Sequence, residues 1–201
     1  MKRYHGAIFV VLAILLPAVC YAKIPVEIAG FKLGAPIENF QDRCRMETAM
    51  PLRYTKFIEE IEIREVTGFK NGLLWVAKCA TPGRIVRIRM KYTDSSKKFY
   101  NELLKRFRKR FGKPSEWRGD PFHIVISWKW SFVDDQNNRI SMILEHNTRN
   151  EEETYGNTIK MTMWNLIDEE RECAKVKKAA LPPSPKKSVP KQVDWDTLLP
   201  R

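Results

Sequence analysis

The hydrophobic pattern of residues 23–173 predicts strands separated by turn signals. Apolar and polar positions alternate most clearly over residues 86–92 and 123–133, which is typical of strands with one buried face. Further stretches, bounded by Gly, Pro, Asn and Asp, predict strands at 58–66, 73–79, 139–147 and 158–166. The pattern therefore predicts about six strands.

One long amphipathic helix is predicted over residues 96–111. Apolar side chains recur there every four positions and would form a single buried face: Phe99, Leu103, Phe107 and Phe111. Asp94 or Ser95 is suited to the N-terminal cap, and Gly112 and Pro114 are typical of a helix end. A short helix is also expected after Pro36, because proline favours the first helical turn.

The predicted elements follow the order short helix, three strands, long helix, three strands. Antiparallel hairpins packed on one side of a helix indicate the α+β class. The repeated order is compatible with a diverged duplication of one αβββ unit, although no repeat is visible in the residues themselves.

The first 22 residues have the layout of a secretory signal peptide. Lys2 and Arg3 precede an apolar run over residues 7–16, and small residues suit a cleavage after Ala22. A transmembrane anchor is one alternative, but a helix needs about 20 apolar residues to span a bilayer. Lipidation at Cys20 is another, disfavoured by the large residue before it. We therefore expect a periplasmic or secreted protein.

Composition changes after Cys173. Residues 174–201 contain five prolines and seven Lys or Arg residues, which favours an extended, disordered arm. Residues 193–200 at its end combine acids with apolar side chains, among them Trp195, Leu198 and Leu199. We interpret this end as a docking peptide; a segment packed back on the body is the alternative. The predicted domains are a signal peptide 1–22, an α+β domain 23–173 and a basic tail 174–201.

Three cysteines remain if the signal with Cys20 is cleaved: Cys44, Cys79 and Cys173. In an oxidising compartment two of them can form a disulfide. We expect the pair Cys44–Cys79, because both lie in the body and Cys173 lies where the tail begins. Three reduced thiols are the alternative. The chain has no Cys-x-x-Cys motif, so neither a thioredoxin-type site nor a zinc ribbon is supported.

Positive charge exceeds negative charge, with 36 Lys and Arg residues against 24 Asp and Glu and a net charge of +12. Five candidate binding residues crowd the long helix: Lys105, Arg106, Arg108, Lys109 and Arg110. A second row lies on one strand: Arg87, Arg89 and Lys91. Such surfaces attract phosphate, lipopolysaccharide, acidic polymers or nucleic acid. The alternatives are a solvated helix face and neutralisation of the strand by cross-strand pairing to Glu60 and Glu62.

Tryptophans are further candidates for a binding surface. Trp128 and Trp130 share strand parity with Ile126, so we expect them in the core. Trp117 and Trp164 lie outside that pattern, and we expect them to edge a binding groove. Two boundary aromatics without a ligand are the alternative.

Catalytic candidates are scarce. Only His123 and His146 remain after signal cleavage, and the motifs of serine hydrolases, zinc proteases and phosphate-binding loops are absent from the sequence. If Val133 pairs with Arg139 in a hairpin, the two histidines lie on opposite faces, which disfavours a shared metal. Asp120 and His123, at a strand entrance, are a weak catalytic pair. We expect no cofactor and no metal site.

Two short patches carry a resemblance. Phe31-Lys32-Leu33-Gly34 precedes a short helix, and Leu104-Lys105-Arg106-Phe107 leads to Phe111-Gly112-Lys113-Pro114 at the end of the long one. This layout resembles secreted α+β envelope domains of the outer-membrane-assembly lipoprotein and β-lactamase-inhibitor type in Gram-negative bacteria. The resemblance covers only these patches and assigns no functional residues. It implies protein–protein interaction rather than catalysis.

The sequence therefore predicts an exported, non-enzymatic interaction module of the cell envelope. Its expected partner is an envelope protein or an anionic envelope component. A small hydrolase that uses Asp120 and His123 is one alternative, and an exported polyanion-binding protein is another. Export argues against intracellular nucleic acid as the partner.

Overall fold

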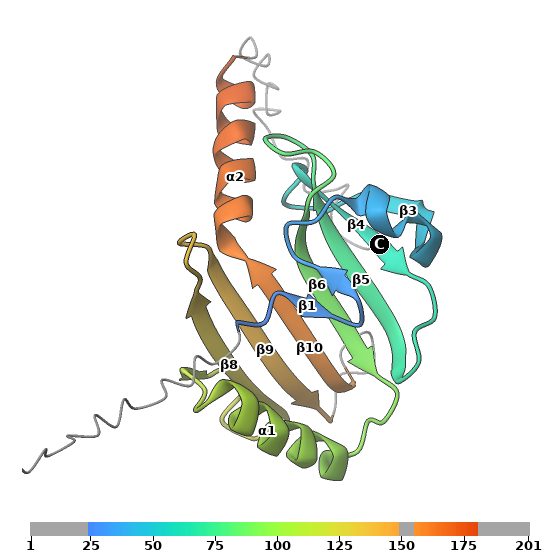
Figure 1. The fold of residues 1–201 in the computed structure, drawn as a ribbon, viewed down its shortest axis with the longest axis vertical. Helices are drawn as coiled ribbons and strands as arrows, with labels where there is room; N and C mark the ends of the chain where they lie inside the picture. Colours follow the sequence, from blue (N-terminus) through green and yellow to red (C-terminus); the bar gives the residue numbers. More distant parts are fainter. Residues whose placement is uncertain (1–23, 149–154, 181–201) are drawn as a thin grey trace, which may run out of the picture.

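The computed structural model describes residues 24–148 and 155–180, and an eight-stranded antiparallel sheet forms its centre (Figure 1). Neighbouring strands follow the order β3-β4-β5-β6-β10-β9-β8-β7. Their bounds are β3 Cys44–Pro51, β4 Ile58–Ile63, β5 Phe69–Ala77, β6 Ile85–Tyr92, β7 Glu116–Trp117, β8 Val125–Val133, β9 Arg139–Asn147 and β10 Gly156–Met163. A separate two-stranded sheet pairs β1 (Glu27–Ile28) with β2 (Phe31–Lys32).

The large sheet consists of two four-stranded meanders, β3 to β6 and β7 to β10, joined where β6 pairs with β10. A helix precedes each meander: the 3-10 helix η1 (Ile37–Arg43) and the α-helix α1 (Lys97–Phe111). The α+β class with an antiparallel sheet is therefore confirmed. The expected count of about six strands is too low, because the two edge strands leave little pattern. β3 exposes most of its side chains, and β7 is two residues long.

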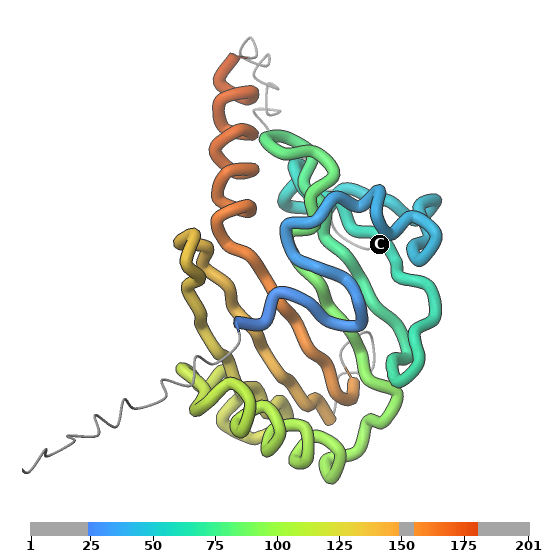
Figure 2. Tube along the Cα trace, viewed as in Figure 1, coloured from blue at the N-terminus to red at the C-terminus, as the bar shows by residue number. Residues whose placement is uncertain are grey.

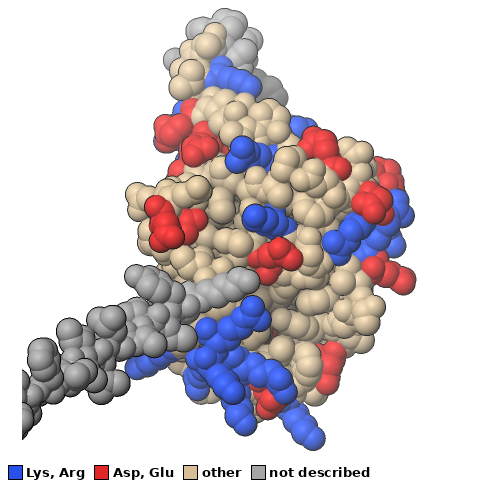
Figure 3. All heavy atoms as spheres, viewed as in Figure 1, with Lys and Arg blue, Asp and Glu red and all other residues tan. Residues whose placement is uncertain are grey.

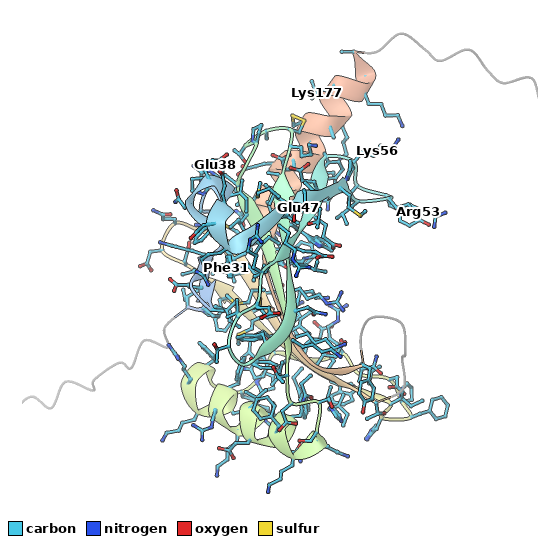
Figure 4. All side chains as sticks on the ribbon, turned by 90° about the vertical axis from the view of Figure 1, so that its right-hand side faces the viewer. Phe31, Glu38, Glu47, Arg53, Lys56 and Lys177 are labelled. Carbon is cyan, nitrogen blue, oxygen red and sulfur yellow. A yellow bond between two sulfur atoms is a disulfide. The ribbon has the colours of Figure 1, made fainter. Side chains whose placement is uncertain are left out.

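One face of the large sheet holds the hydrophobic core. Side chains there are almost fully buried, among them Leu74, Ile88, Met142, Met161 and Trp130. The β1–β2 hairpin, η1 and α1 lie on this side, as the edge-on view in Figure 4 shows. Trp128 and Trp130 point to this core face, as their parity predicted.

α1 lies close to its predicted position. Its cap is the Ser96 hydroxyl, which accepts a hydrogen bond from the backbone N–H of Phe99 at 3.2 Å, rather than the expected Asp94 or Ser95. The Asp94 carboxylate instead accepts from Ser96 N. Gly112 follows the helix with a φ of +80°, a conformation that favours glycine.

The β8–β9 hairpin has the predicted register, with Val133 opposite Arg139 and Ile126 opposite His146. His146 therefore lies on the core face and is 3 % exposed. His123 lies in the loop before β8 and is exposed.

α2 (Trp164–Ala179) continues directly from β10 and projects beyond one end of the sheet (Figure 1). The predicted last strand therefore ends at Met163 rather than at residue 166. Residues 174–179 are helical, although their composition is typical of the tail. The proposed signal peptide and most of the predicted tail, with Trp195, Leu198 and Leu199, lie outside the described residues. Within the described ranges, no helix has the length and apolar character needed to cross a membrane.

The disulfide joins Cys79 to Cys173, which corrects the expected Cys44–Cys79 pair. The correction follows from α2, because this helix carries Cys173 to the β5–β6 loop that lies beside it in Figure 2. Cys44 is a free thiol at the start of β3 and is 0 % exposed. Burial raises the pKa of this thiol to about 11.

A buried carboxylate reinforces the same connection. Glu170 of α2 is 0 % exposed and accepts hydrogen bonds from four successive backbone N–H groups. Its Oε2 accepts from Lys78 and Cys79 at 3.0 and 2.5 Å, and its Oε1 accepts from Ala80 and Thr81 at 2.8 Å each. α2 is therefore fixed to the β5–β6 loop by one covalent bond and by a set of charge-assisted hydrogen bonds.

Candidate functional site

The sheet face opposite α1, here called the polar face, carries side chains in rows that cross several strands. One row runs from β4 to β9 and contains Glu60, Trp75, Arg87, Thr162 and Ser141. The next row contains Glu62, Leu73, Arg89, Lys160 and Ile143. β5 separates the two glutamates of β4 from the arginines of β6, so these residues are not direct cross-strand neighbours, as the alternative considered above assumed.

Arg87 is held at the centre of the polar face. Its Nε donates to Thr162 Oγ1 at 2.8 Å. Its guanidinium carbon lies 3.7 Å from the centre of the Trp75 ring and 5.9 Å from that of the Trp164 ring. Burial lowers the pKa of Arg87 to about 10, which leaves the group charged at neutral pH.

Both tryptophans beside Arg87 are fixed by their own hydrogen bonds. Trp75 Nε1 donates to Glu60 Oε2 at 2.7 Å. Trp164 Nε1 donates to Ser141 Oγ at 2.9 Å. The guanidinium is therefore positioned by the surrounding side chains before any ligand arrives.

Lys160 lies one row from Arg87, as its diagonal neighbour across the β6–β10 pair. Diagonal neighbours are about 7–8 Å apart, which long side chains can bridge. Lys160 is half-buried, and its burial, together with the nearby charge of Arg87, lowers its pKa. In the part of the chain that the structure describes, neither Arg87 nor Lys160 forms an ion pair with a carboxylate.

A groove of about 610 Å³ opens beside this row of cations. Its lining includes Glu60 and Glu62 of β4, Leu73 of β5, and Arg89 and Lys91 of β6. Glu60 is also the acceptor for Trp75, so the groove adjoins the Arg87 row.

A second positive surface lies on α1, where Figure 3 shows Lys and Arg gathered. The α1 cationic surface consists of seven exposed side chains: Lys97, Lys98, Lys105, Arg106, Arg108, Lys109 and Arg110. The helix has one carboxylate, Glu102, which pairs with Arg106 at 2.9 Å. Arg108 lies over the Trp128 ring, with its guanidinium carbon 5.5 Å from the ring centre. The other α1 cations form no ion pair with any described residue.

The structure does not bring Trp117 and Trp164 to one groove. Trp117 of β7 packs edge-on against Trp128 on the core face, with ring centres 4.8 Å apart. Trp164 bonds to Ser141 on the polar face. The two predicted groove residues therefore lie on opposite faces of the sheet.

Asp120 and His123 form a turn before β8. The Asp120 carboxylate accepts from the backbone N–H groups of Val125 and Phe122, and these bonds lower its pKa. His123 has a φ of +57° and packs against Trp117, with ring centres 5.7 Å apart. These contacts account for both residues as parts of the turn.

A buried polar cluster lies under the start of α1. Asn157 Nδ2 donates to the carbonyls of Asp94 and Ser96 at 2.7 and 3.0 Å, so its Oδ1 is left to accept from His146 Nδ1 at 2.7 Å. His146 Nε2 and the Tyr100 hydroxyl are buried without a hydrogen-bond partner among the described residues.

Comparisons with protein-family models, with curated proteins and with solved structures found no match to this chain.

Proposed function

We propose that the protein is an exported, non-enzymatic binding module of the cell envelope, which attaches to an anionic lipid surface through the α1 cationic surface. The exposure of seven cations on one helix carries the proposal. The apolar side of α1 is already occupied by the sheet, since Phe107 lies 5.9 Å from Trp130 between ring centres. Attraction to an anionic surface therefore needs no rearrangement of the core.

Two features of the chain support export and a binding role. Disulfides persist in oxidising compartments, so the Cys79–Cys173 bond agrees with export by the signal predicted at residues 1–22. The contacts of Asp120 with backbone N–H groups favour a structural role for it over catalysis. The periplasm is the compartment that we propose.

Vesicle co-sedimentation tests this function. The mature chain, from residue 23 on, is mixed with vesicles of phosphatidylcholine alone or with phosphatidylglycerol added. We expect binding only to the anionic vesicles, with a strong loss as salt rises. Each cation near such a surface contributes about 1 kcal/mol, so Lys105→Glu/Lys109→Glu should weaken binding by at least about 30-fold.

The matched control is Lys177→Glu/Lys178→Glu, which makes the same charge change in the last turn of α2. Equal weakening by both double variants would mean that net charge alone drives binding, and it would refute a role specific to α1. Equal binding to neutral vesicles would refute the proposal as a whole.

The predicted C-terminal docking peptide is a second contact in this proposal. Because α2 extends to Ala179, the chain should be shortened after Ala180 rather than after Cys173. We expect in-cell crosslinking to an envelope protein to be lost and the melting temperature to stay unchanged. A large fall in melting temperature would make the tail part of the fold.

A further inference from the structure

Arg87 and Lys160 form a separate concentration of positive charge on the polar face, away from α1. A guanidinium has five N–H donors, and the one on Nε is used by Thr162. The terminal nitrogens of Arg87 have no acceptor among the described residues, and they are not fully buried. They are therefore accessible to an acceptor from outside.

The surroundings offer donors and positive charge to such an acceptor. Lys160 contributes a half-buried ammonium without an ion-pair partner in the described chain. A half-buried cation without a direct ion pair is unfavourable. The nearby Glu145 carboxylate offsets part of this cost, and an incoming anion relieves more of it. The planar guanidinium matches two oxygens of one anionic group, while the ammonium contacts a third as a point charge.

We propose that Arg87 and Lys160 bind the phosphate group of a phosphomonoester. A phosphomonoester carries close to two negative charges at neutral pH, which matches two cations better than a carboxylate does. The adjoining groove of about 610 Å³ accommodates the rest of the ligand. Its walls carry charges of both signs, among them Glu60, Glu62, Arg89 and Lys91, so a polar, hydroxyl-bearing remainder suits the groove.

Isothermal titration of the oxidised mature chain at pH 7.5 and low ionic strength tests the site. The probes are inorganic phosphate, glycerol 3-phosphate and acetate, each at matched ionic strength. We expect saturable binding of the two phosphates and much weaker binding of acetate. No saturable phosphate binding, or equal binding of acetate, would overturn the proposal.

Three variants locate the site. Arg87→Gln should weaken phosphate binding by at least about tenfold, because charge-assisted hydrogen bonds are lost, and Lys160→Gln by about five- to tenfold. Lys129→Gln is the matched control, since Lys129 lies on the same face but pairs with Glu116 at 3.1 Å. Near-ultraviolet circular dichroism checks that each variant folds. If Arg87→Gln does not fold, phosphate binding by Lys160→Gln tests the site. Equal effects of Lys129→Gln and Lys160→Gln would overturn the assignment.

Two further measurements are needed. One distinguishes a lipid headgroup from a free metabolite as the ligand, and the other distinguishes the polar-face site from the α1 cationic surface. Vesicles that contain phosphatidic acid present a phosphomonoester headgroup, and tighter binding to them than to glycerol 3-phosphate, lost in Lys160→Gln, identifies a lipid ligand. The reverse preference identifies a free metabolite. Lys105→Glu/Lys109→Glu should keep glycerol 3-phosphate binding, whichever way the vesicle test of α1 turns out. Loss of that binding in the α1 variant alone would overturn the polar-face site.

Discussion

Replacing Glu170 with Gln tests whether the buried carboxylate fixes α2 to the sheet. Each carboxylate oxygen accepts from two backbone N–H groups. Gln keeps the shape but turns one oxygen into an NH₂ group that faces two donors. Leaving a buried donor without an acceptor costs about 1–3 kcal/mol, so Glu170→Gln should lower the free energy of unfolding by about 2–6 kcal/mol.

Urea unfolding and calorimetry of the oxidised chain from residue 23 on measure this loss. For a chain of this size, the lower limit of about 2 kcal/mol corresponds to a fall in melting temperature of about 4–8 °C. Glu172→Gln is the control, because Glu172 is exposed on the same helix and pairs with Lys175 at 2.7 Å. Its effect should stay below about 1 kcal/mol. A melting temperature of Glu170→Gln within 1 °C of this control would refute the reasoning.

The same comparison under reducing conditions shows whether the carboxylate and the disulfide act together. Both hold α2 against the same loop, and they are separated by one turn of helix. We expect their losses to be non-additive, because contacts that share one interface couple. Additive losses would mean that the carboxylate and the disulfide hold α2 to the loop independently of each other.

Three further predictions concern the cysteines and the buried hydroxyl. Reduction of Cys79–Cys173 should lower the free energy of unfolding by about 4–5 kcal/mol, because the bond spans 94 residues of chain; urea titrations with and without dithiothreitol measure this, and Cys79→Ala/Cys173→Ala should not respond to the reductant. Cys44 should resist iodoacetamide at pH 8, since the thiolate is the nucleophile and burial raises the pKa to about 11; mass spectrometry that finds it alkylated as fast as in urea would contradict this. The folded pKa lies above the ordinary value of 9.0, so the thiol's contribution to stability is complete below about pH 9 and is lost as pH rises towards 11. Tyr100→Phe should raise stability by about 1 kcal/mol, because it removes a buried hydroxyl without a described partner; a loss of that size in urea unfolding, absent from the exposed control Tyr54→Phe, would show that the hydroxyl is bonded.

Local patterns were sufficient to predict α1 and the β8–β9 hairpin. The four-residue apolar repeat defines one helix face. The hairpin has the register that pairs Val133 with Arg139, which places Ile126 and Trp130 on the core face; a one-residue slip would have reversed the faces. The edge strand β3 was missed because most of its side chains are exposed, so its sequence shows no alternation. An edge strand that buries few side chains carries little of the alternating pattern that identifies a strand.

The polar-face site needed contacts between distant segments. The row of β6 cations was visible in the sequence, but its neighbour Lys160 became visible only once β10 was paired with β6. In the sequence, Glu170 cannot be distinguished from an exposed acid on a helix surface. Only the approach of the β5–β6 loop makes it a buried acceptor. The disulfide was mispredicted for a related reason, since its pairing depends on how far α2 extends. By contrast, the cations of α1 are exposed through local periodicity and were predicted from it.

The position of β10 determines when the large sheet can close as the chain folds. β10 is the last strand in the described chain, yet it lies in the interior of the sheet between β6 and β9. Until residues 156–163 are available to fold, the two half-sheets lack the strand that joins them, and β6 and β9 present unpaired edges to other chains. A chain truncated before residue 156 would therefore expose two further strand edges instead of forming a smaller closed sheet. A chaperone that binds the incomplete chain would be needed most at these two edges.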